Sequence, residues 1–303
     1  MVERKLKVVV TGASGFLGKQ VVKDLKKISS IELISLTRNK NADFYTDYSL
    51  NSLNRWFENA DVVVHLAAKR GRGVTFEDYN ENVLLSEKVV IASKENSIGK
   101  FIYISSISAY SDSNLLPWRE NDSPSPCSFY GLSKVVGEEI CRLHLNSTET
   151  SLYILRLAHV FGPNEKNNYM INLFIRQALN KQELSLTNLT EDKREFIYIK
   201  DVIKAIRMTI FHDDGDDGYY LLNIGAENIL TNLEVGKLVN KVFDNEKLLV
   251  LGDISKNSSN SSFMNHSLAK STIDYSASYS MEKALEEIKQ EMEGVEKNVP
   301  IFY

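Results

Sequence analysis

Between a short apolar run and a helical pattern stands Thr11-Gly12-Ala13-Ser14-Gly15-Phe16-Leu17-Gly18. Its glycines have the spacing of a strand–turn–helix unit that binds a dinucleotide. The first glycine permits a tight turn, the second lets backbone N–H groups approach a pyrophosphate, and the third lets the helix pack closely on the sheet. The N-terminus of the helix adds unpaired N–H groups and a positive dipole end, which favour an anion. The stretch therefore predicts a dinucleotide-binding turn.

Strand-like and helical patterns alternate around this turn through the first half of the chain. The run Val62–Ala67 is apolar throughout, which is typical of a strand buried on both faces. Such alternation predicts an α/β fold with a doubly wound parallel Rossmann sheet. The expected strands are Leu6–Thr11, Ile31–Thr37, Val62–Ala67, Phe101–Ser105 and Leu152–Leu157. The expected helices are Phe16–Lys27, Asn82–Ser93 and Tyr130–His144.

The second half is less regular and predicts a smaller C-terminal substrate-binding domain. We expect the NAD(P)-binding Rossmann domain to comprise residues 1–158 and 196–224, and the substrate-binding domain residues 159–195 and 225–303. The expected elements of this half are the helices Tyr169–Asn180, Asn232–Phe243 and Met281–Met292 and the strands Phe196–Ile199 and Tyr220–Ile224. Residues 212–218 are expected to form a surface turn and residues 255–267 a long loop.

Composition favours a globular protein with small-molecule chemistry. The 303 residues are 43% hydrophobic and 25% charged, with a net charge of −4, so no basic field invites nucleic acid or a membrane surface. The sequence contains no run of about 18 apolar residues, so no membrane span is predicted. The cysteines, Cys127 and Cys141, are too few for a disulfide framework. With no signal-peptide pattern at the N-terminus, we expect a cytoplasmic protein without a metal site.

Tyr130 and Lys134 are the candidates for proton transfer. They stand four residues apart in an expected helix and so share one face. A free tyrosine has a pKa of about 10. A lysine about 4 Å away, at an effective dielectric near 20, contributes on the order of 4 kcal/mol, or roughly three pKa units. Such a tyrosine can exchange protons near neutrality. An isolated pair is usually an ordinary helix face, but here it follows a glycine-rich turn.

Ser106 is the candidate for orienting a substrate carbonyl. It ends an expected strand, and ligands of doubly wound sheets bind at the carboxyl ends of the strands. Its hydroxyl could donate a hydrogen bond to a carbonyl or alkoxide oxygen. Ser105 and Ser108 are the local alternatives.

The sequence resembles the extended short-chain dehydrogenase/reductase family of the nucleotide-sugar epimerase and dehydratase type, from about residue 6 to 225. The resemblance is carried by the glycine-rich turn and by Asp61–Ala68, Ser105-Ser106, Tyr130-Gly-Leu-Ser-Lys134, Arg156–Pro163, Arg194–Asp201 and Asn223-Ile-Gly225. It implies that Tyr130 is the acid/base, that Lys134 tunes it and binds the ribose, and that Ser106 orients the carbonyl.

The resemblance also implies a set of binding residues. The implied cofactor-binding residues are Gly12, Ser14, Gly15, Phe16, Leu17, Gly18, Arg38, Asp47, Leu66, Ala67, Ala68, Asn82, Tyr130 and Lys134. The implied substrate contacts are Ser106, His159 and Arg194. His65, next to this loop, is expected to be structural. A homodimer is expected, because the family often pairs the helices that correspond to Asn82–Ser93 and Tyr130–His144.

Arg38 bears on the choice of nicotinamide cofactor. An acidic residue after the second strand would accept from the ribose 2′-OH, whereas a guanidinium can bind a 2′-phosphate. Arg38 and the nearby Lys40 therefore favour NADP(H), with NAD(H) possible; a solvated loop is the plain alternative. Asp47 stands where family members often contact the adenine amine, although a turn residue would look the same.

The positions after Ser106 bear on the reaction. Related 4,6-dehydratases carry an Asp-Glu pair there, and this chain has Ile107 and Ser108, which disfavours dehydration. Arg38 favours NADPH-dependent reduction of a 4-keto nucleotide sugar. The alternatives are a nucleotide-sugar 4-epimerase with tightly bound NAD and a non-catalytic, cofactor-sensing regulator.

The expected substrate contacts depart from the family pattern. Many epimerases have asparagine where His159 stands, so this histidine either replaces that contact or is merely packed. Arg194 either meets a diphosphate or pairs with Glu195 or Glu191. No arginine follows Arg207, which leaves Arg194, lysines such as Lys256 or the backbone to bind substrate phosphates. The alternative is a substrate that is not a nucleotide sugar. The cationic loop 69–73 is either an anion site or solvated.

Overall fold

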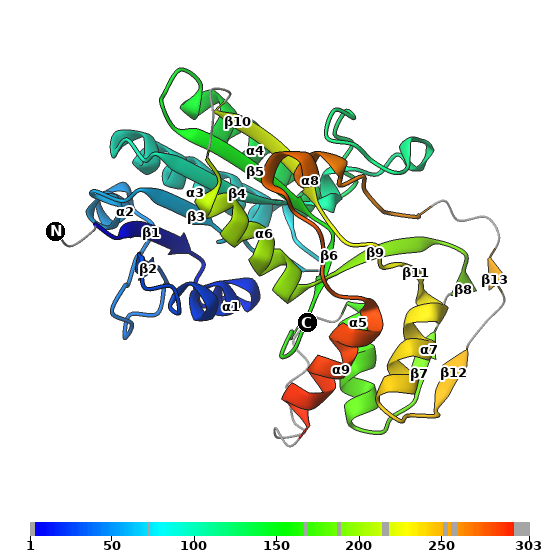
Figure 1. Ribbon diagram of the computed structural model, residues 1–303. Coiled ribbons are helices and arrows are strands. Elements are labelled where there is room, and N and C mark those ends of the chain that lie inside the picture. The colour runs from blue at the N-terminus through cyan, green and yellow to red at the C-terminus, as the bar shows by residue number, and fades with distance from the viewer. Residues whose placement is uncertain are drawn as a thin grey trace.

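The computed structural model describes residues 4–71, 73–166, 169–186, 189–213, 218–250, 254–255 and 260–293. A six-stranded parallel sheet forms the centre, in the order β10-β5-β4-β3-β1-β2 (Figure 1). Its strands are β1 (Leu6–Thr11), β2 (Ile31–Ser35), β3 (Val62–His65), β4 (Lys100–Ser106), β5 (Ser151–Leu157) and β10 (Tyr219–Ile224). The expected α/β fold with a doubly wound parallel sheet is confirmed.

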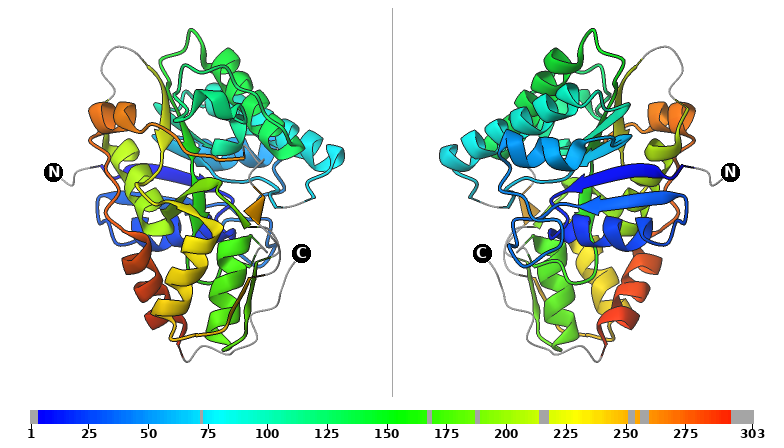
Figure 2. Two further views of the ribbon diagram at one scale, coloured as in Figure 1. Left: turned by 90° about the vertical axis from the view of Figure 1, so that its right-hand side faces the viewer. Right: turned by 90° about the vertical axis from the view of Figure 1, so that its left-hand side faces the viewer.

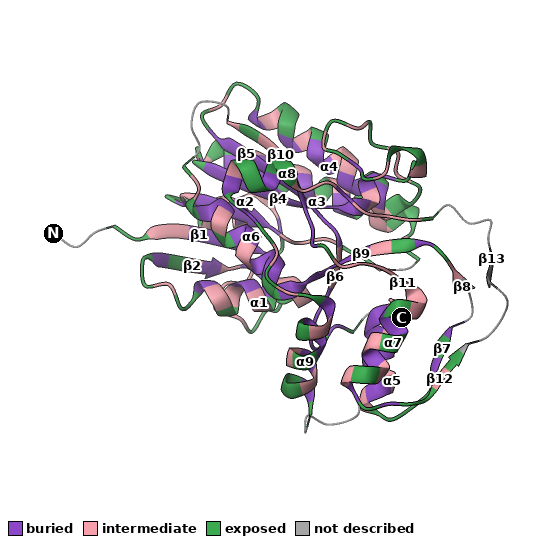
Figure 3. Ribbon diagram, turned by 45° about the vertical axis from the view of Figure 1, so that its right-hand side comes forward, coloured by how far each residue is buried: buried purple, intermediate pink, exposed green. Residues whose placement is uncertain are grey.

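Helices cover both faces of the sheet because successive residues of each strand point to opposite sides. Val9 packs with α2 (Leu50–Phe57), α3 (Phe76–Glu95) and α4 (Phe129–Leu145). Val8 and Val10 pack on the other side with α1 (Phe16–Leu25) and α6 (Ile199–Phe211). The two further views show these helix layers (Figure 2), and the buried residues follow the strands between them (Figure 3).

The strand order places a topological switch beside β1. The chain runs from β1 to β2 on one side and then continues through β3, β4 and β5 on the other. In open α/β sheets the crevice at such a switch, outside the carboxyl ends of the strands, is where ligands bind. The glycine-rich turn directly follows β1 and therefore opens into this crevice.

A smaller lobe lies beyond the carboxyl ends of these strands (Figure 1). Its three-stranded sheet has the order β11-β9-β6, from Ile229–Thr231, Lys193–Tyr198 and His159–Phe161. Its helices are α5 (Met170–Leu179), α7 (Asn232–Val242) and α9 (Met281–Met292). Two short pairs, β7 (Leu184–Leu186) with β12 (Leu248–Val250) and β8 (Leu189–Thr190) with β13 (Ile254–Ser255), complete it. The exact domain boundaries stay a prediction.

Several elements differ from expectation. The helix expected from Asn82 begins at Phe76, because Thr75 and Asp78 form a capping box. Helices α2, α6 and α8 (Ser267–Ile273) were not expected. The turn expected at 212–218 and the loop expected at 255–267 lie partly outside the described residues. In the described part of that loop, the Trp118 N–H donates to Phe263 O at 3.0 Å, which ties it to the segment after β4.

No helix within the described ranges is long and apolar enough to cross a membrane.

Candidate active site

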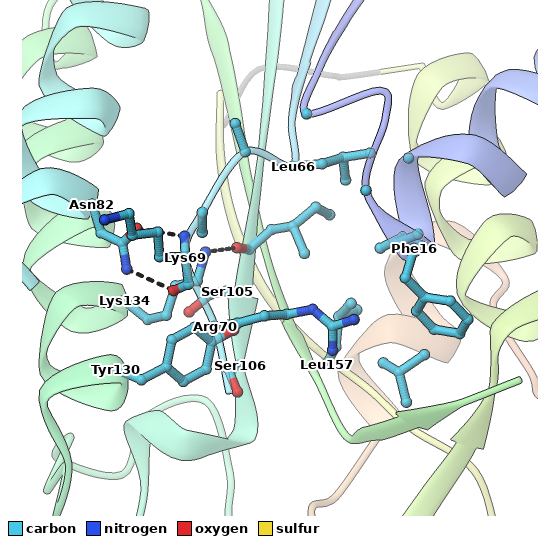
Figure 4. A pocket seen from close by; sticks show the side chains of 18 of the residues that line it. Phe16, Leu66, Lys69, Arg70, Asn82, Ser105, Ser106, Tyr130, Lys134 and Leu157 are labelled. Atoms are coloured by element: carbon cyan, nitrogen blue, oxygen red, sulfur yellow. Dashed lines mark hydrogen bonds between the residues drawn. The ribbon is translucent and has the colours of Figure 1, made fainter. Parts of the chain in front are cut away.

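A cavity of about 710 Å³ lies in the crevice between the sheet and the smaller lobe. Its walls come from the ends of β1, β3, β4 and β5 and from the start of α5 (Figure 4). The residues that the resemblance implies for cofactor, substrate and catalysis line it: Gly12, Ser14, Gly15, Phe16, Leu17, Gly18, Arg38, Asp47, Leu66, Ala67, Ala68, Asn82, Ser106, Tyr130, Lys134, His159 and Arg194. The structure thus brings the whole set together, while the role of each residue stays a prediction. Lys40, expected near the cofactor phosphate, is not part of this lining.

The glycine-rich turn has the close approaches that require glycine. Gly12 has a φ of +69°, and a Cβ there would lie 2.7 Å from Ala67 N. A Cβ at Gly18 would lie 2.2 Å from Gly12 O, so α1 packs directly on the turn. Gly15 caps α1 without a side-chain hydrogen bond, which leaves the end of the helix open toward the cavity. These features fit a dinucleotide pyrophosphate.

Tyr130 and Lys134 lie in the first turns of α4 and face the end of β4 (Figure 4). The buried Lys134 amine donates to Ile104 O at 2.8 Å and lies 5.8 Å from the centre of the Tyr130 ring. Burial lowers the pKa of Lys134 to about 8 and raises the pKa of Tyr130. A hydrogen bond with Ser106 and the charge of Arg70 oppose the shift at Tyr130. The sequence predicted that Lys134 would lower the pKa of Tyr130, but the net shift is upward because burial outweighs the nearby charges. Proton exchange by the pair stays a prediction.

The serines at the end of β4 have different partners. The Ser105 hydroxyl donates to the buried Glu138 carboxylate. The Ser106 hydroxyl lies beside Tyr130 in the cavity and donates to Ser108 Oγ at 3.2 Å (Figure 4). Ser105, Ser106 and Ser108 all line the cavity, and the role expected for Ser106 stays a prediction.

Arg38 and Asp47 lie at the end of the cavity beyond the glycine-rich turn. The exposed Arg38 side chain makes no ion pair with any described residue. Asp47 Oδ1 accepts from the backbone N–H and hydroxyl of Ser49 at 2.9 and 2.7 Å, and these bonds lower the pKa of Asp47. Lys88 of α3 lines the same end and was not anticipated. Two cations and one carboxylate therefore surround the expected adenosine position.

Asn82 fixes the loop after β3. Its Oδ1 accepts from Lys69 N at 2.7 Å and its Nδ2 donates to Lys69 O at 2.9 Å. Just before the loop, the buried His65 ring bonds Thr11 Oγ1 at 2.8 Å and Ser86 Oγ at 3.3 Å. Burial lowers the pKa of His65 to about 3, so the ring is neutral. These contacts fit the structural role expected for His65.

The cationic side chains of the loop 69–73 have different partners. Lys69 pairs with Asp78 at 2.9 Å and Glu81 at 2.8 Å. Arg70 instead extends across the cavity (Figure 4), where it pairs with the buried Glu165 of the smaller lobe and lies 5.5 Å from the centre of the Phe16 ring. Sequence reasoning missed Glu165, since no local pattern links residues 95 positions apart. Arg72 and Lys256 lie outside the described residues.

His159 and Arg194 lie on neighbouring strands of the smaller sheet. His159 Nε2 lies 3.0 Å from Ser262 Oγ, and burial, with a contribution from Arg194, lowers the pKa of His159 to about 4. Glu195, one of the two partners expected for Arg194, instead accepts from Ala226 N at 2.7 Å and Met264 N at 2.8 Å in the core. A neutral imidazole and a guanidinium therefore face the same end of the cavity.

Comparison with known proteins identifies the family. Residues 8–225 match the model of the NAD dependent epimerase/dehydratase family. The solved UDP-N-acetylglucosamine 4-epimerase of Bacillus cereus is 39% identical, with a TM-score of 0.88 over 99% of this chain and all of that one. An uncharacterised UDP-glucose epimerase of Bacillus subtilis is 27% identical over 92% of this chain and 96% of its own length.

A further solved structure shows the same fold with ligands. The UDP-glucuronic acid 4-epimerase of Bacillus cereus, in complex with UDP-glucuronic acid and NAD, has a TM-score of 0.81 at 23% identity, over 94% of this chain and 99% of that one. The match of the family model covers more than two thirds of the sequence and includes the turn, Ser106, Tyr130 and Lys134. This chain therefore belongs to the NAD dependent epimerase/dehydratase family and is an enzyme of the extended short-chain dehydrogenase type.

Proposed function

We propose that this enzyme is a nucleotide-sugar 4-epimerase that acts on a UDP-linked hexose and keeps its nicotinamide cofactor bound. The observation that carries the proposal is the 39% identity to a UDP-N-acetylglucosamine 4-epimerase over nearly the whole chain. The comparisons thus favour the epimerase over the 4-ketoreductase that the sequence favoured. Ile107 and Ser108, in place of a carboxylate pair, continue to disfavour a dehydratase.

The side chains in the cavity supply the proton transfer that epimerisation needs. The Tyr130 phenolate takes the proton of the C4 hydroxyl while Ser106 donates a hydrogen bond to the same oxygen. Lys134, held by Ile104 O, stabilises the phenolate by its charge. A bound nicotinamide would supply a hydride acceptor and donor. After the 4-keto sugar turns its other face, Tyr130 returns the proton, so the enzyme ends each cycle unchanged.

His159 and Arg194 are proposed to bind the diphosphate end of the substrate. Arg194 provides a cation with a forked set of donors. The neutral His159 ring can donate one hydrogen bond, as the asparagine of many relatives would. Tyr169, at the start of α5, lines the cavity near Tyr130 and is a further candidate sugar contact.

Arg38 and Lys88 still favour a phosphate on the adenosine ribose, and so NADP(H). NAD(H) is the alternative, because the UDP-glucuronic acid 4-epimerase binds NAD. An epimerase differs from a ketoreductase in retaining its cofactor between turnovers, whether or not that cofactor carries a 2′-phosphate. Arg38 is also the observation that keeps a second candidate, an NADPH-dependent 4-ketoreductase.

The deciding experiment is native mass spectrometry of the purified protein, followed by incubation with UDP-N-acetylglucosamine or UDP-glucose without added cofactor. Proton NMR should show the C4 epimer appear until the two sugars reach equilibrium. The Tyr130→Phe variant is the matched control and should show no conversion. If a 4-keto nucleotide sugar instead consumes one NADPH per molecule and no epimer forms, the enzyme is a ketoreductase.

We also propose a homodimer that pairs α3 and α4. Both helices expose apolar side chains: Leu84 of α3 is 54% exposed and Leu143 of α4 is 65% exposed. Phe76, Tyr79 and Phe129 form an aromatic cluster on the same two helices, with Phe76 58% exposed. Exposed apolar side chains gathered in this way are typical of an interaction surface.

A further inference from the structure

Glu138 is a buried carboxylate directly behind the proposed acid–base pair. It lies one turn after Lys134 on α4, and its side chain is 6% exposed. Arg156 of β5 donates to both of its oxygens, from Nε at 3.0 Å and from Nη2 at 2.6 Å. The Ser105 hydroxyl donates to it as well. Its hydrogen-bonding capacity is thus used by partners from two strands.

These contacts join the elements that carry the proposed catalytic residues. Ser105 immediately precedes Ser106 and pairs across the sheet with Arg156. Glu138 therefore fixes α4 against the end of β4. Arg156 extends the network by donating to Tyr110 Oη at 2.6 Å, and Tyr110 donates to Asn223 of β10 at 3.0 Å.

Packing alone does not explain a charged pair at this place. Burying two charges costs several kcal/mol per ion, and apolar residues of similar volume often hold a helix to a sheet equally well. A function for the buried pair is therefore expected in the effect of the Glu138 charge on a neighbouring group. Among the proposed catalytic residues, the charge acts on Lys134, one turn before Glu138 on α4, whose pKa Glu138 raises against the larger effect of burial.

We propose that Glu138 is a positioning residue that keeps the Lys134 amine cationic and holds α4 against the end of β4, where Ser106 stands. The inference rests on the proposed acid–base role of Tyr130 and Lys134. Arg156 and Ser105 act through Glu138 by fixing the direction of its carboxylate.

Other titratable and charged groups interact with the pair or with its neighbours: His65 of β3, Tyr103 of β4, Cys141 of α4, Tyr219 of β10, Arg70 of the loop after β3, and Tyr110 and Tyr169. His65 is neutral above about pH 3. Burial raises the pKa of the Cys141 thiol and of Tyr103, so both stay neutral. A change of charge near pH 8 therefore belongs to Lys134, because burial raises the pKa of Tyr130 above its usual value.

The test measures the charge of Lys134 without substrate. Trace acetylation at a series of pH values, read by peptide mass spectrometry, reports the pH at which the Lys134 amine becomes reactive. Glu138→Gln keeps the shape of the side chain and removes its charge. The midpoint should then move to lower pH by roughly one unit, because the ammonium loses a nearby anion. Glu139→Gln, at the exposed neighbouring carboxylate, is the matched control and should leave the midpoint unchanged.

Activity provides the second readout. In Glu138→Gln, kcat should fall about tenfold with little change in KM, since the loss lies in the proton-transfer geometry. Glu138→Asp, which retains the charge, should keep the midpoint of Lys134. An unchanged midpoint in Glu138→Gln overturns the proposal. Because labelling needs no sugar, the midpoint tests the role of Glu138 even if the protein turns over no UDP-hexose.

A second variant serves the case in which Glu138→Gln does not fold because Arg156 is left without its partner. The double variant Glu138→Gln/Arg156→Met leaves no uncompensated charge in the core. Its midpoint should move in the same direction, because the charge of Glu138 acts on the pKa of Lys134 and Arg156 is not among the groups that shift it. A midpoint equal to that of the unmodified chain again overturns the proposal.

Discussion

The Lys134 amine lies 5.8 Å from the centre of the Tyr130 ring. Both residues project from one face of α4 into the cavity, and the amine cannot drift because Ile104 O holds it at 2.8 Å. A fixed cation at this distance stabilises the phenolate more than the phenol. The arrangement makes Tyr130 the group whose loss should affect the chemistry most.

Tyr130→Phe should lower turnover by about 10²- to 10⁴-fold, the usual contribution of a general acid/base. The nicotinamide should remain bound, since only a hydroxyl is removed. Turnover is measured by NMR and cofactor content by native mass spectrometry. Tyr79→Phe, on α3, is the control. A Tyr130→Phe enzyme with near-normal turnover would refute the assignment.

The rate should fall as the pH rises above about 8. Burial disfavours the charged amine, so the pKa of Lys134 is lowered to about 8 and the cation is lost above that value. Without the cation, the phenolate loses its stabilising charge. A pH profile of kcat/KM checks this, with circular dichroism to show that the fold persists. A rate that stays level beyond about pH 9 in the folded protein contradicts the prediction.

Arg38→Ala should weaken NADPH binding by about 10- to 100-fold, which corresponds to the 1.5–3 kcal/mol of a charge-assisted hydrogen bond. NADH binding should change little, because NADH has no 2′-phosphate. Fluorescence titration with both cofactors measures the difference. Arg55→Ala, an exposed arginine on α2, serves as the control. Equal losses for the two cofactors would make Arg38 an ordinary loop residue.

Gly137→Ala should lower the free energy of unfolding by about 1–3 kcal/mol. A Cβ at this position would lie 2.1 Å from Tyr103 Oη, so α4 would have to move away from β4. Gly99→Ala is the control, because its Cβ would lie 3.4 Å from Asp61 O. Urea unfolding compares the two. Equal stability would show that α4 adjusts without cost.

Leu143→Asp should convert the proposed dimer into a monomer, because a charge would be buried in the paired face of α3 and α4. Sedimentation velocity measures the mass. Phe211→Asp places the same charge at an exposed apolar position on α6 and should leave the dimer intact. The idea fails if the two variants behave alike.

The residues of the site could be predicted where chemistry depends on local spacing. The glycines of the turn and the Tyr130–Lys134 pair follow rules that span a few residues. The capping box of Thr75 and Asp78 predicts the start of α3. The apolar periodicity of this helix is weak and does not, so the start was missed. Glu138 resembled any acidic helix residue, because nothing local shows that Arg156 and Ser105 surround it.

Contacts between distant segments could not be predicted in the same way. Arg70 and Glu165 meet only because the loop after β3 and the smaller lobe face each other across the cavity. The short strands β6 and β11 have three residues each and carry too little pattern to detect. Their form depends on the pairing with β9, which the sequence does not display.

The hydrogen bond between His159 and Ser262 has a consequence for folding during translation. The two residues are 103 positions apart. A ribosome adds about 5–20 residues each second, so Ser262 is made roughly 5–20 s after His159. By then the glycine-rich turn and α4 have already been synthesised. During this interval the nascent chain contains the glycine-rich turn and α4 but lacks the segment around Ser262. The apolar lining of the cavity is then still accessible to a chaperone.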